Sequence, residues 1–569
     1  MGHVPSEMLA LQRLYHWERA HPDRIALTQP MGAANGGQVR DMSWAEVGDQ
    51  VRRMAAHLKA LGLAPGTKVA ILSKNCAWWL MSDLAIWMAD CVSVPLYPTL
   101  APDTITQILT HSEAAVCFVG KLDGWDQLKT GLPAGLRCIS YPLSPPEALQ
   151  HFEDWDSICA RSRPLQGTPV RAAEELATVI YTSGTTGKPK GVMHSFGNFA
   201  WALDTGIKRI PMSADDRMLS YLPMAHVVER VLVEHGWLRT GMRLYFAESL
   251  DTFTADIQRA RPTIFFSVPR LWLKFQQGVH HKMAPALLDR LLSIPIVSTL
   301  VRRKVLKALG LDQCRIAAGG AAPMPAALLA WFRKLGLPIN EGYGLTENLA
   351  VSHITVPGQN QEGTVGPGYE GVDTRIDPET GEIQMRSAAL MLGYYKAPEL
   401  THEAFTSDGW LRTGDKGLVD AQDRLHITGR VKDLFKTSKG KYVAPAPIED
   451  RLVMHEAIEA CVVTGANLGQ PLGIVMLNAE AAARANDAAA RAALEIALGQ
   501  HLRSVNQTLD PHERLSCLVV VTQAWTVDND LITPTFKVKR NRIEDLYASQ
   551  YAAWEASGRQ VIWQAATLG

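Results

Sequence analysis

The chain has 569 residues, too many for one ordinary hydrophobic core, so a large part of several lobes and a smaller further domain are expected. Its 57 Lys and Arg residues balance 57 Asp and Glu residues, which excludes the basic excess that draws a protein to nucleic acid. With 47% apolar and 20% charged residues, the composition is that of a globular protein and excludes a disordered one.

The compartment is indicated by the cysteines and by the apolar stretches. The eight cysteines lack the spacing that structural zinc requires, and neither zinc nor disulfides are expected. The N-terminus lacks the basic start and apolar block of a secretory signal. The stretch from Trp78 to Leu96 contains Asp83 and Asp90, which are costly at a bilayer centre, so we expect a buried helix and strand. A cytoplasmic protein follows, with association at a membrane surface left open.

Helical and strand patterns alternate along the N-terminal two thirds of the chain. Apolar residues at helical spacing predict a helix over residues 44–62, and short β-rich runs predict strands at residues 68–73 and 263–269. This alternation is typical of layered α/β architecture. Residues 283–310 are apolar with a basic end. They predict either a helix on a membrane surface or a packed helical hairpin interrupted by Pro295, and we favour the hairpin.

From about Asp377 the sequence pattern changes to short strand-like runs separated by turn residues, which predicts a β-rich subdomain. Beyond Arg430 lie a Lys- and Gly-rich stretch and a mixed α/β tail with an Ala-rich helix over residues 479–502. We therefore predict an N-terminal domain of residues 1–430 and a C-terminal domain of residues 431–569.

A β-like apolar segment runs directly into a loop of Ser, Thr and Gly in LATVIYTSGTTGKPKG, residues 176–191. Backbone amides at glycines, hydroxyl donors and a lysine are the groups that cradle a pyrophosphate. The loop is not a Walker loop, because its glycines are too closely spaced and Pro189 follows the lysine. A flexible linker is the alternative, but linkers do not usually follow a buried strand. The candidate phosphate-binding residues are Thr182, Ser183, Gly184, Thr185, Thr186, Gly187 and Lys188.

Four further residues have side chains suited to a nucleotide. Tyr343 offers an aromatic face for a purine, and Glu347 offers the oxygen ligand that Mg²⁺ prefers, although a turn and a helix cap would also explain that run. Asp415 can accept hydrogen bonds from both ribose hydroxyls, and an ordinary turn aspartate is its alternative. Arg430 presents a planar fork of donors for ribose and phosphate oxygens.

Together these runs resemble the signatures of the adenylate-forming superfamily of acyl-CoA synthetases, adenylation domains and luciferases. The motifs, in order, are YTSGTTGKPKG (181–191), EGYGLTEN (341–348), WLRTGD (410–415), GRVKDLFKTSKGKYVAP (429–445) and ITPTFKVKR (532–540). Two further runs resemble the long-chain fatty acyl-CoA synthetases, SYLPMAHVVERV (220–231) and MLGYYKAPELTHEAF (391–405). The resemblance implies a large N-terminal domain of two α/β subdomains plus a β-rich one, and a small mobile α+β C-terminal domain.

The resemblance also implies how the nucleotide is bound. Tyr343 would stack on adenine, Glu347 would contact Mg²⁺, and Thr346 would lie near the α-phosphate. The run GGAAPMP at residues 319–325 is similar to the family's adenine-lining loop. In addition to the phosphate loop, the implied ATP and AMP site comprises Gly320, Ala321, Tyr343, Gly344, Asp415 and Arg430.

Lys537 resembles the family's mobile catalytic lysine, which reaches the carboxylate of the acid and the α-phosphate as negative charge builds up. Without the resemblance, Lys539, Arg540 or Arg542 could equally be the reagent, or all could form a solvated basic face. His226 would lie beside the activated carboxylate, although a lone histidine on an apolar segment is more often a core residue.

The hinge and the transfer loop are implied in the same way. Lys432 would be the pivot of the C-terminal domain, although a charge in a solvated linker is the alternative. Residues 433–440 would serve the transfer to coenzyme A. Lys439 precedes Gly440 where the long-chain branch commonly has another glycine, and a side chain there is costly if the backbone needs positive φ.

The implied activity is that of an acid–thiol ligase with a fatty acid, Mg-ATP and coenzyme A as substrates, and the long-chain motifs favour a long-chain acid. It would form acyl-AMP and pyrophosphate, and then acyl-CoA and AMP. One alternative is a ligase for another acid, or for a carrier protein as acceptor. The other is a silent acyl- or nucleotide-binding homologue, which should have lost Lys537, Glu347 or Asp415. No nucleic acid is expected, and peripheral membrane contact and oligomerisation are left open.

Overall fold

The computed structural model describes residues 4–32, 37–183, 189–359, 363–527, 529–533 and 537–564. The chain divides into two compact units. The first comprises Met1–Ala321, Leu329–Thr374 and Met385–Arg412, and the second Ala322–Leu328, Arg375–Gln384 and Thr413–Gly569. A domain boundary just after Arg430 stays a prediction.

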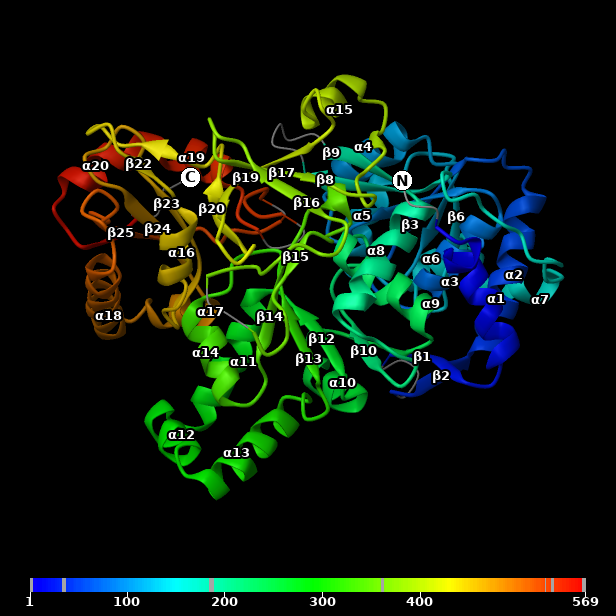
Figure 1. Ribbon diagram of the computed structural model, residues 1–569, viewed down its shortest axis with the longest axis horizontal. Coiled ribbons are helices and arrows are strands. Elements are labelled where there is room, and N and C mark those ends of the chain that lie inside the picture. Colours follow the sequence, from blue (N-terminus) through cyan, green and yellow to red (C-terminus); the bar gives the residue numbers. More distant parts are fainter. Residues whose placement is uncertain are drawn as a thin grey trace. The chain divides into compact units, whose positions relative to one another are not determined.

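The largest sheet of the first unit has the strand order β18-β9-β8-β4-β3-β5-β6-β7. Its strands β9, β8, β3 and β6 are labelled in Figure 1. Strands β3 to β8 pair in parallel, whereas β9 and β18 are antiparallel to their neighbours. The strands are β3 Lys68–Leu72, β4 Val92–Leu96, β5 Val116–Val119, β6 Arg137–Ser140, β7 Glu153–Asp154, β8 Leu176–Ser183, β9 Pro189–Ser195 and β18 Gly393–Tyr394. Helix α3 (Ala77–Met88) is buried along its whole length and contacts β3 and β4, which confirms the buried helix and strand predicted between residues 78 and 96.

Two four-stranded sheets complete the α/β part of this unit, in the orders β10-β11-β1-β2 and β12-β13-β14-β15. The strands of the first are β1 Ile25–Pro30, β2 Val39–Ser43, β10 Arg217–Ser220 and β11 Arg243–Phe246. Those of the second are β12 Ile264–Ser267, β13 Ile316–Gly319, β14 Ile339–Tyr343 and β15 His353–Ile354. The predicted helix over residues 44–62 is confirmed as α2 (Trp44–Ala60), which begins where the Ser43 hydroxyl accepts a hydrogen bond from the Glu46 amide.

Helices surround these sheets, and two of them form the hairpin predicted for residues 283–310. They are α12 (Pro285–Leu292) and α13 (Pro295–Ala308). Pro295 begins α13, because its fixed φ and missing amide suit the first turn of a helix. No helix in the described part of the chain is long and apolar enough to cross a membrane. The other helices here are α1 Ala10–Ala20, α4 Pro102–Ser112, α5 Trp125–Leu128, α6 Pro146–His151, α7 Trp155–Arg161, α8 Phe196–Arg209, α9 Gly236–Thr240, α10 Phe253–Ala260, α11 Pro269–Lys282, α14 Ala326–Lys334 and α15 Pro398–Ala404.

The predicted β-rich subdomain is the sheet β16-β17-β19-β20. Some of its residues belong to the first compact unit and the others to the second. Its strands are β16 Asp373–Ile376, β17 Glu382–Arg386, β19 Leu411–Val419 and β20 Leu425–Arg430. The second unit also contains the hairpin of β21 (Phe435–Lys436) and β22 (Tyr442–Val443). Its own sheet has the order β23-β24-β25-β26, with strands Ile458–Thr464, Leu472–Leu477, Leu518–Val521 and Val561–Trp563.

The helices of the second unit correct one expectation. The Ala-rich segment predicted as a single helix is two, α17 (Ala479–Arg484) and α18 (Ala488–Gln507). Asn478 and Asp487 each accept a hydrogen bond from the amide three residues on, so each caps a new helix. The remaining helices are α16 Ala446–Leu452, α19 Arg540–Tyr547 and α20 Tyr551–Ala556.

Candidate functional site

The predicted phosphate loop lies between two paired strands. β8 runs into it and β9 leaves it antiparallel, with Ser183 opposite Pro189. The strand predicted before the loop is therefore present, and Thr182 is half-buried at its end. Gly184, Thr185, Thr186, Gly187 and Lys188 lie outside the described residues.

The predicted adenine-lining residues come together at the ends of β13 and β14, which pair in parallel. A Cβ atom on Gly320 would lie 2.8 Å from the carbonyl oxygen of Gly342, so a larger residue would push the two strands apart. Ala321 has a φ of +67°, and Tyr343 is half-buried at the end of β14. A Cβ atom on Gly344 would lie 2.4 Å from the backbone of Ala350, so glycine is required there.

Thr346 and Glu347 lie in a short 3-10 helix. Each accepts a hydrogen bond from a side chain of a strand in the largest sheet. His194 of β9 donates a hydrogen bond from Nε2 to the carbonyl oxygen of Thr346, at 2.7 Å. Burial lowers the pKa of His194 to about 4, so this imidazole stays neutral at physiological pH. Tyr394 donates a hydrogen bond from its hydroxyl to Oε1 of Glu347, at 2.8 Å.

Tyr394 is a site residue that motif reasoning did not single out. It reaches Glu347 because β18 pairs with β9, with Tyr394 opposite Val192. Burial and the Glu347 carboxylate raise the pKa of Tyr394 well above its usual range, so the phenol keeps its proton. The ammonium of Lys190 lies 5.4 Å from the centroid of the Tyr394 ring. The run MLGYYKAPEL was the available signal, but only the strand pairing shows which tyrosine faces Glu347.

His226 is half-buried in the loop between β10 and a π-helix, Glu229–His235. Its Nδ1 accepts a hydrogen bond from the Val228 amide at 3.3 Å. The buried Glu229 holds this loop by accepting hydrogen bonds from the Ser220 hydroxyl, at 2.8 Å, and the Tyr221 amide, at 3.1 Å. Burial raises the pKa of Glu229 to about 8, partly offset by these hydrogen bonds. Glu229 therefore positions the His226 loop.

In the second unit Asp415 and Arg430 face each other across β19 and β20, where they occupy paired positions. Arg430 donates a hydrogen bond from Nε to Oδ1 of Asp415, at 3.1 Å, and Asp415 is only 5% exposed. Gly414, with a φ of +73°, turns the strand just before Asp415. The two predicted ribose-binding residues thus form one carboxylate–guanidinium pair.

Lys537 differs from the three basic residues that follow it. Lys539 and Arg542 both form ion pairs with Asp530, and Arg540 forms one with Glu449 at 2.6 Å. Among the described residues Lys537 forms no ion pair. Although its side chain reaches solvent, surrounding protein atoms desolvate it and lower its pKa to about 8, with a further lowering by Arg430 and an opposing effect of Asp415.

The predicted hinge and transfer loop also lie in the second unit. Lys432 is exposed in the turn after β20. Lys439 and Gly440 lie in the β21–β22 hairpin, where the Gly440 amide donates to the carbonyl of Thr437 at 2.9 Å. Gly440 has a φ of +75°, whereas Lys439 is outside the positive-φ region. The side chain of Lys439 therefore causes no backbone strain.

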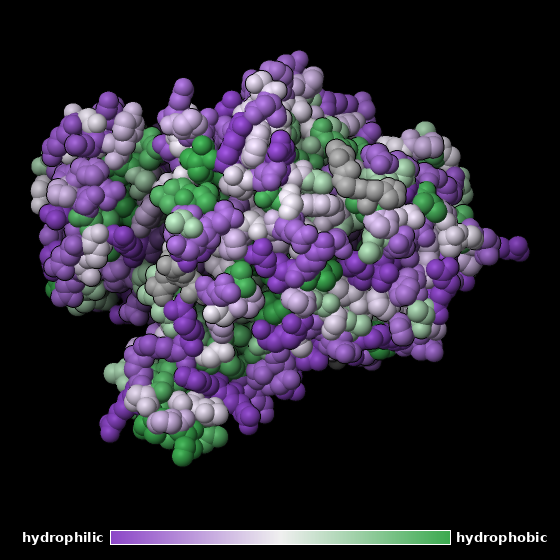
Figure 2. Space-filling model, viewed as in Figure 1, coloured by the Kyte–Doolittle hydropathy of each residue, from purple (hydrophilic) through white to green (hydrophobic). Residues whose placement is uncertain are grey.

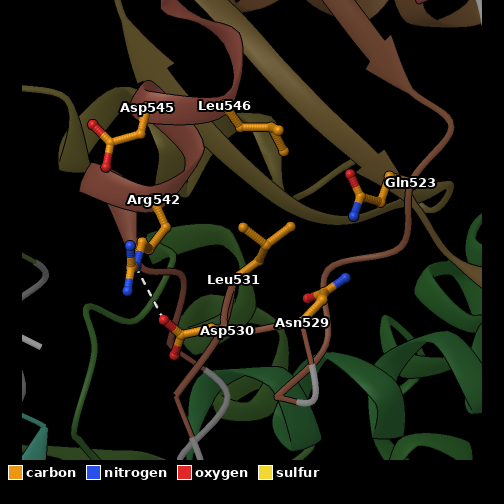
Figure 3. Close-up of a pocket in the computed structure, with 7 residues that line it drawn as sticks. All are labelled: Gln523, Asn529, Asp530, Leu531, Arg542, Asp545 and Leu546. Carbon is orange, nitrogen blue, oxygen red and sulfur yellow. Dashed lines mark hydrogen bonds and ion pairs between the residues drawn. The ribbon is translucent and has the colours of Figure 1, made fainter. Parts of the chain in front are cut away.

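A shallow pocket of about 490 Å³ also lies in this unit (Figure 3). Its walls include Asp530 and Arg542, whose Nε and Oδ2 atoms are 3.0 Å apart. Leu531 and Leu546 supply its apolar wall. None of the predicted site residues that the structure describes is among the residues that line it.

No cluster of three or more metal-ligating side chains occurs in the part of the chain that the structure describes. A magnesium ion carried by ATP does not need one, because phosphate oxygens and water supply most of its ligands. One oriented carboxylate suffices, and Glu347 is half-buried and held by Tyr394. The residues present fit Mg-ATP in that sense.

Comparison with known proteins identifies a family and relatives that match almost the whole chain. The family described as AMP-binding enzyme matches residues 14–395, and its C-terminal domain matches residues 432–554. The chain is 30% identical to the long-chain-fatty-acid–CoA ligase FadD15 of Mycobacterium bovis, over 95% of this chain and 96% of that protein. It is 28% identical to long chain acyl-CoA synthetase 3 of Arabidopsis thaliana, over 91% and 87% of the two chains.

Solved structures share the fold. The A domain of carboxylic acid reductase from Segniliparus rugosus, in complex with AMP and a co-purified carboxylic acid, superimposes with a TM-score of 0.80, at 22% identity and over 97% and 95% of the two chains. The anthranilate CoA ligase AuaEII, in complex with anthranoyl-AMP, gives a TM-score of 0.76, at 21% identity and over 96% and 99%. The expected α/β architecture with a smaller C-terminal part is confirmed.

Proposed function

The chain belongs to the AMP-binding enzyme family, and from this premise we propose that it is an ATP-dependent fatty acid–CoA ligase. The observation that carries the proposal is Lys537, which forms no ion pair among the described residues, whereas Lys539, Arg540 and Arg542 each do. It is electrostatically coupled to Arg430 and Asp415. An unpaired ammonium at a nucleotide site stabilises the charge of a phosphoryl transition state. The near full-length similarity to long-chain ligases favours a long-chain acid.

In the first step a carboxylate oxygen of the acid forms a bond to the α-phosphorus of ATP, and the bond to the pyrophosphate oxygen breaks. Lys537 donates hydrogen bonds to the carboxylate and the α-phosphate as charge builds up. Asp415 accepts hydrogen bonds from the ribose hydroxyls, and Tyr343 stacks on adenine. Glu347 would hold the Mg²⁺ of Mg-ATP, which neutralises phosphate charge. Thr346 and the loop from Thr182 onward lie along the phosphates in this assignment.

In the second step the sulfur of coenzyme A forms a bond to the acyl carbon, the mixed anhydride bond breaks, and AMP leaves. The thiol proton passes to solvent. We assign the Asp433–Gly440 loop to this step and the Arg430–Lys432 segment to the rotation that exchanges it with Lys537. His226 is assigned to the carboxylate of the acid, in a loop that Glu229 holds.

The test is formation of a thioester from palmitate, Mg-ATP and coenzyme A, with AMP and pyrophosphate measured alongside. Thioester with an equal amount of AMP would support the ligase. Pyrophosphate or acyl-AMP without thioester would point to another acceptor, such as a carrier protein. ATP binding without turnover of palmitate or of shorter and aromatic acids would identify a silent homologue.

Replacement of the catalytic cation gives the first prediction. Lys537→Ala should lower acid-dependent pyrophosphate release on the order of 10²–10³-fold while ATP binding is largely kept, because the ammonium acts on the transition state. Lys539→Ala is the matched control, since this neighbouring lysine is already ion-paired with Asp530. Equal losses in the two variants would remove Lys537 from the mechanism.

A further inference from the structure

The hairpin of α12 and α13 carries a cluster of exposed apolar side chains that the ligase reaction does not use. Of the exposed large apolar side chains among the described residues, four lie within fourteen positions: Leu287, Ile294, Ile296 and Leu300. Ile296 is 81% exposed and Leu300 is 64% exposed. The two helices lie together at the lower edge of Figure 1, and apolar side chains gather at the same place in Figure 2. We refer to these four residues as the hairpin tip.

The outer face of α13 changes from apolar to basic along its length. Residues 296, 300, 303 and 307 follow one another at intervals of three or four, so they lie on one side of the helix. The first two are apolar and belong to the hairpin tip, whereas Arg303 and Lys307 are exposed and cationic, as is the adjoining Lys304. Cations on the last turns of a helix also compensate its dipole.

The charge around the hairpin tip is predominantly positive. Arg303, Lys304 and Lys307 form no ion pair within the described residues, and Arg290 and Lys282 are exposed nearby. The carboxylate carried by the two helices, Asp289, is paired with Lys334 at 3.1 Å. These basic residues are therefore available to an anionic partner.

The hairpin is fixed to the rest of the unit at its base. Leu288 and Val305 are buried on the inner sides of the two helices. Gln258 of α10 donates a hydrogen bond from Nε2 to the carbonyl oxygen of Ala308, at 2.8 Å. A Cβ atom on Gly310 would lie 2.8 Å from the backbone of Ile257, so the chain after α13 packs closely on α10. The tip is thus exposed on a preformed element.

We propose that the hairpin tip inserts into the interface of an anionic phospholipid membrane, with Arg303, Lys304 and Lys307 on the phosphate groups. This contact goes beyond the proposed ligase activity and does not depend on it. Apolar side chains beside a row of cations are what an interfacial helix presents to such a surface. A second copy of the chain fits less well, because a two-fold contact through the tip would bring two basic rows together.

Vesicle flotation tests the proposal without ATP, coenzyme A or acid, so its result is independent of the ligase assay. The purified chain is mixed with vesicles of phosphatidylcholine alone, or of two parts phosphatidylcholine and one part phosphatidylglycerol. Binding is expected to the anionic vesicles and to weaken as salt is added. Ile296→Ser/Leu300→Ser should lower the partition coefficient at least about tenfold. Leu250→Ser is the matched control, because Leu250 is 92% exposed but lies outside the hairpin.

Charge is tested separately. Each of Arg303→Gln, Lys304→Gln and Lys307→Gln should weaken binding to the anionic vesicles about fivefold, and the triple variant should lose most of the dependence on salt. Failure of the parent chain to float, or equal binding by the Ile296→Ser/Leu300→Ser variant, would overturn the proposal. So would a change of oligomeric state in that variant without vesicles, measured by sedimentation velocity, because the tip would then be a contact between copies.

Discussion

The surroundings of the Lys537 ammonium group differ from those of the three basic residues that follow it. Lys539 and Arg542 share the carboxylate of Asp530 and Arg540 is paired with Glu449, whereas Lys537 is desolvated and forms no ion pair within the described residues. An ammonium is stabilised less in such surroundings than in water, so its pKa falls toward neutrality.

The lowered pKa predicts the pH dependence of catalysis. Lys537 must be protonated to stabilise negative charge, so kcat/KM for ATP should be sustained below a pKa of about 8 and should fall as pH rises through it. In Lys537→Arg the guanidinium stays charged, so this alkaline limb should disappear from whatever activity is kept. The measurement is the pH profile of initial pyrophosphate release. A limb near pH 8 that persists in the arginine variant would assign that titration to another group.

The hydroxyl group of Tyr394 allows a test of the Glu347 site, because it can be removed while the ring is kept. Tyr394→Phe deletes the hydroxyl that donates to Glu347 and keeps the ring beside Lys190. A hydrogen bond to a charged group contributes about 1.5–3 kcal/mol, so the efficiency with Mg-ATP should fall at least about tenfold. The magnesium dependence of pyrophosphate release measures this effect. Tyr395→Phe is the adjacent control, and an equal loss there would show that the effect is not local to Glu347.

At the scale of elements, the site depends on close approaches of backbone that only glycine allows. Gly320 lies against the backbone of Gly342, and Gly344 lies against that of Ala350. Tyr343 is the last residue of β14, and the chain after it continues into the 3-10 helix with Glu347, so these contacts lie on both sides of Tyr343. The position of the aromatic ring therefore depends on backbone packing before any ligand binds.

Gly344→Ala should disrupt this arrangement, because its Cβ atom would lie 2.4 Å from the backbone of Ala350. Overpacking of this kind costs about 1–3 kcal/mol of folding free energy, and ATP affinity should fall with it. Gly342→Ala is the matched control, since its Cβ atom would meet nothing closer than 3.8 Å. Denaturant unfolding and ATP binding are measured for both. A Gly344→Ala variant as stable and as tight-binding as the parent would contradict the packing argument.

At the scale of the whole molecule, the proposed reaction needs two arrangements of one chain. The second unit contains both Lys537, assigned to adenylation, and the β21–β22 hairpin with Gly440, assigned to thiol transfer. Both assignments require access to the same acyl group. Lys432, exposed in the turn after β20, is the position at which a change of backbone angles is assigned.

Lys432→Pro tests the hinge by locking φ near −65°. If the chain turns at this residue, one half-reaction should be kept and the other lost. Pyrophosphate release from palmitate and ATP, and conversion of added acyl-AMP to acyl-CoA, are measured separately. Lys432→Ala, which removes the charge but leaves the backbone free, should keep both. Equal loss of both half-reactions in the proline variant, or of neither, would rule out Lys432 as the pivot.

The sequence by itself determined the family, the layered α/β architecture and the candidate residues, because these depend on local periodicity and on contiguous motifs. The helix over residues 44–62 was predictable for that reason, whereas the hairpin over residues 283–310 was the favoured of two interpretations that periodicity did not separate. The break between α17 and α18 was missed, since the Ala-rich composition outweighed the caps at Asn478 and Asp487.

Only the tertiary structure decided which side chains meet. The contact of Tyr394 with Glu347 requires β18 to pair with β9, and the pairing of Asp415 with Arg430 requires the register of β19 and β20. Neither register can be read from the spacing of residues along the chain. The distinction between Lys537 and its basic neighbours likewise depends on Asp530, in the preceding turn, and on Glu449, which long-range packing brings to Arg540. Exposure of the α12–α13 tip has the same origin, because periodicity shows that a helix has an apolar side but not what covers it.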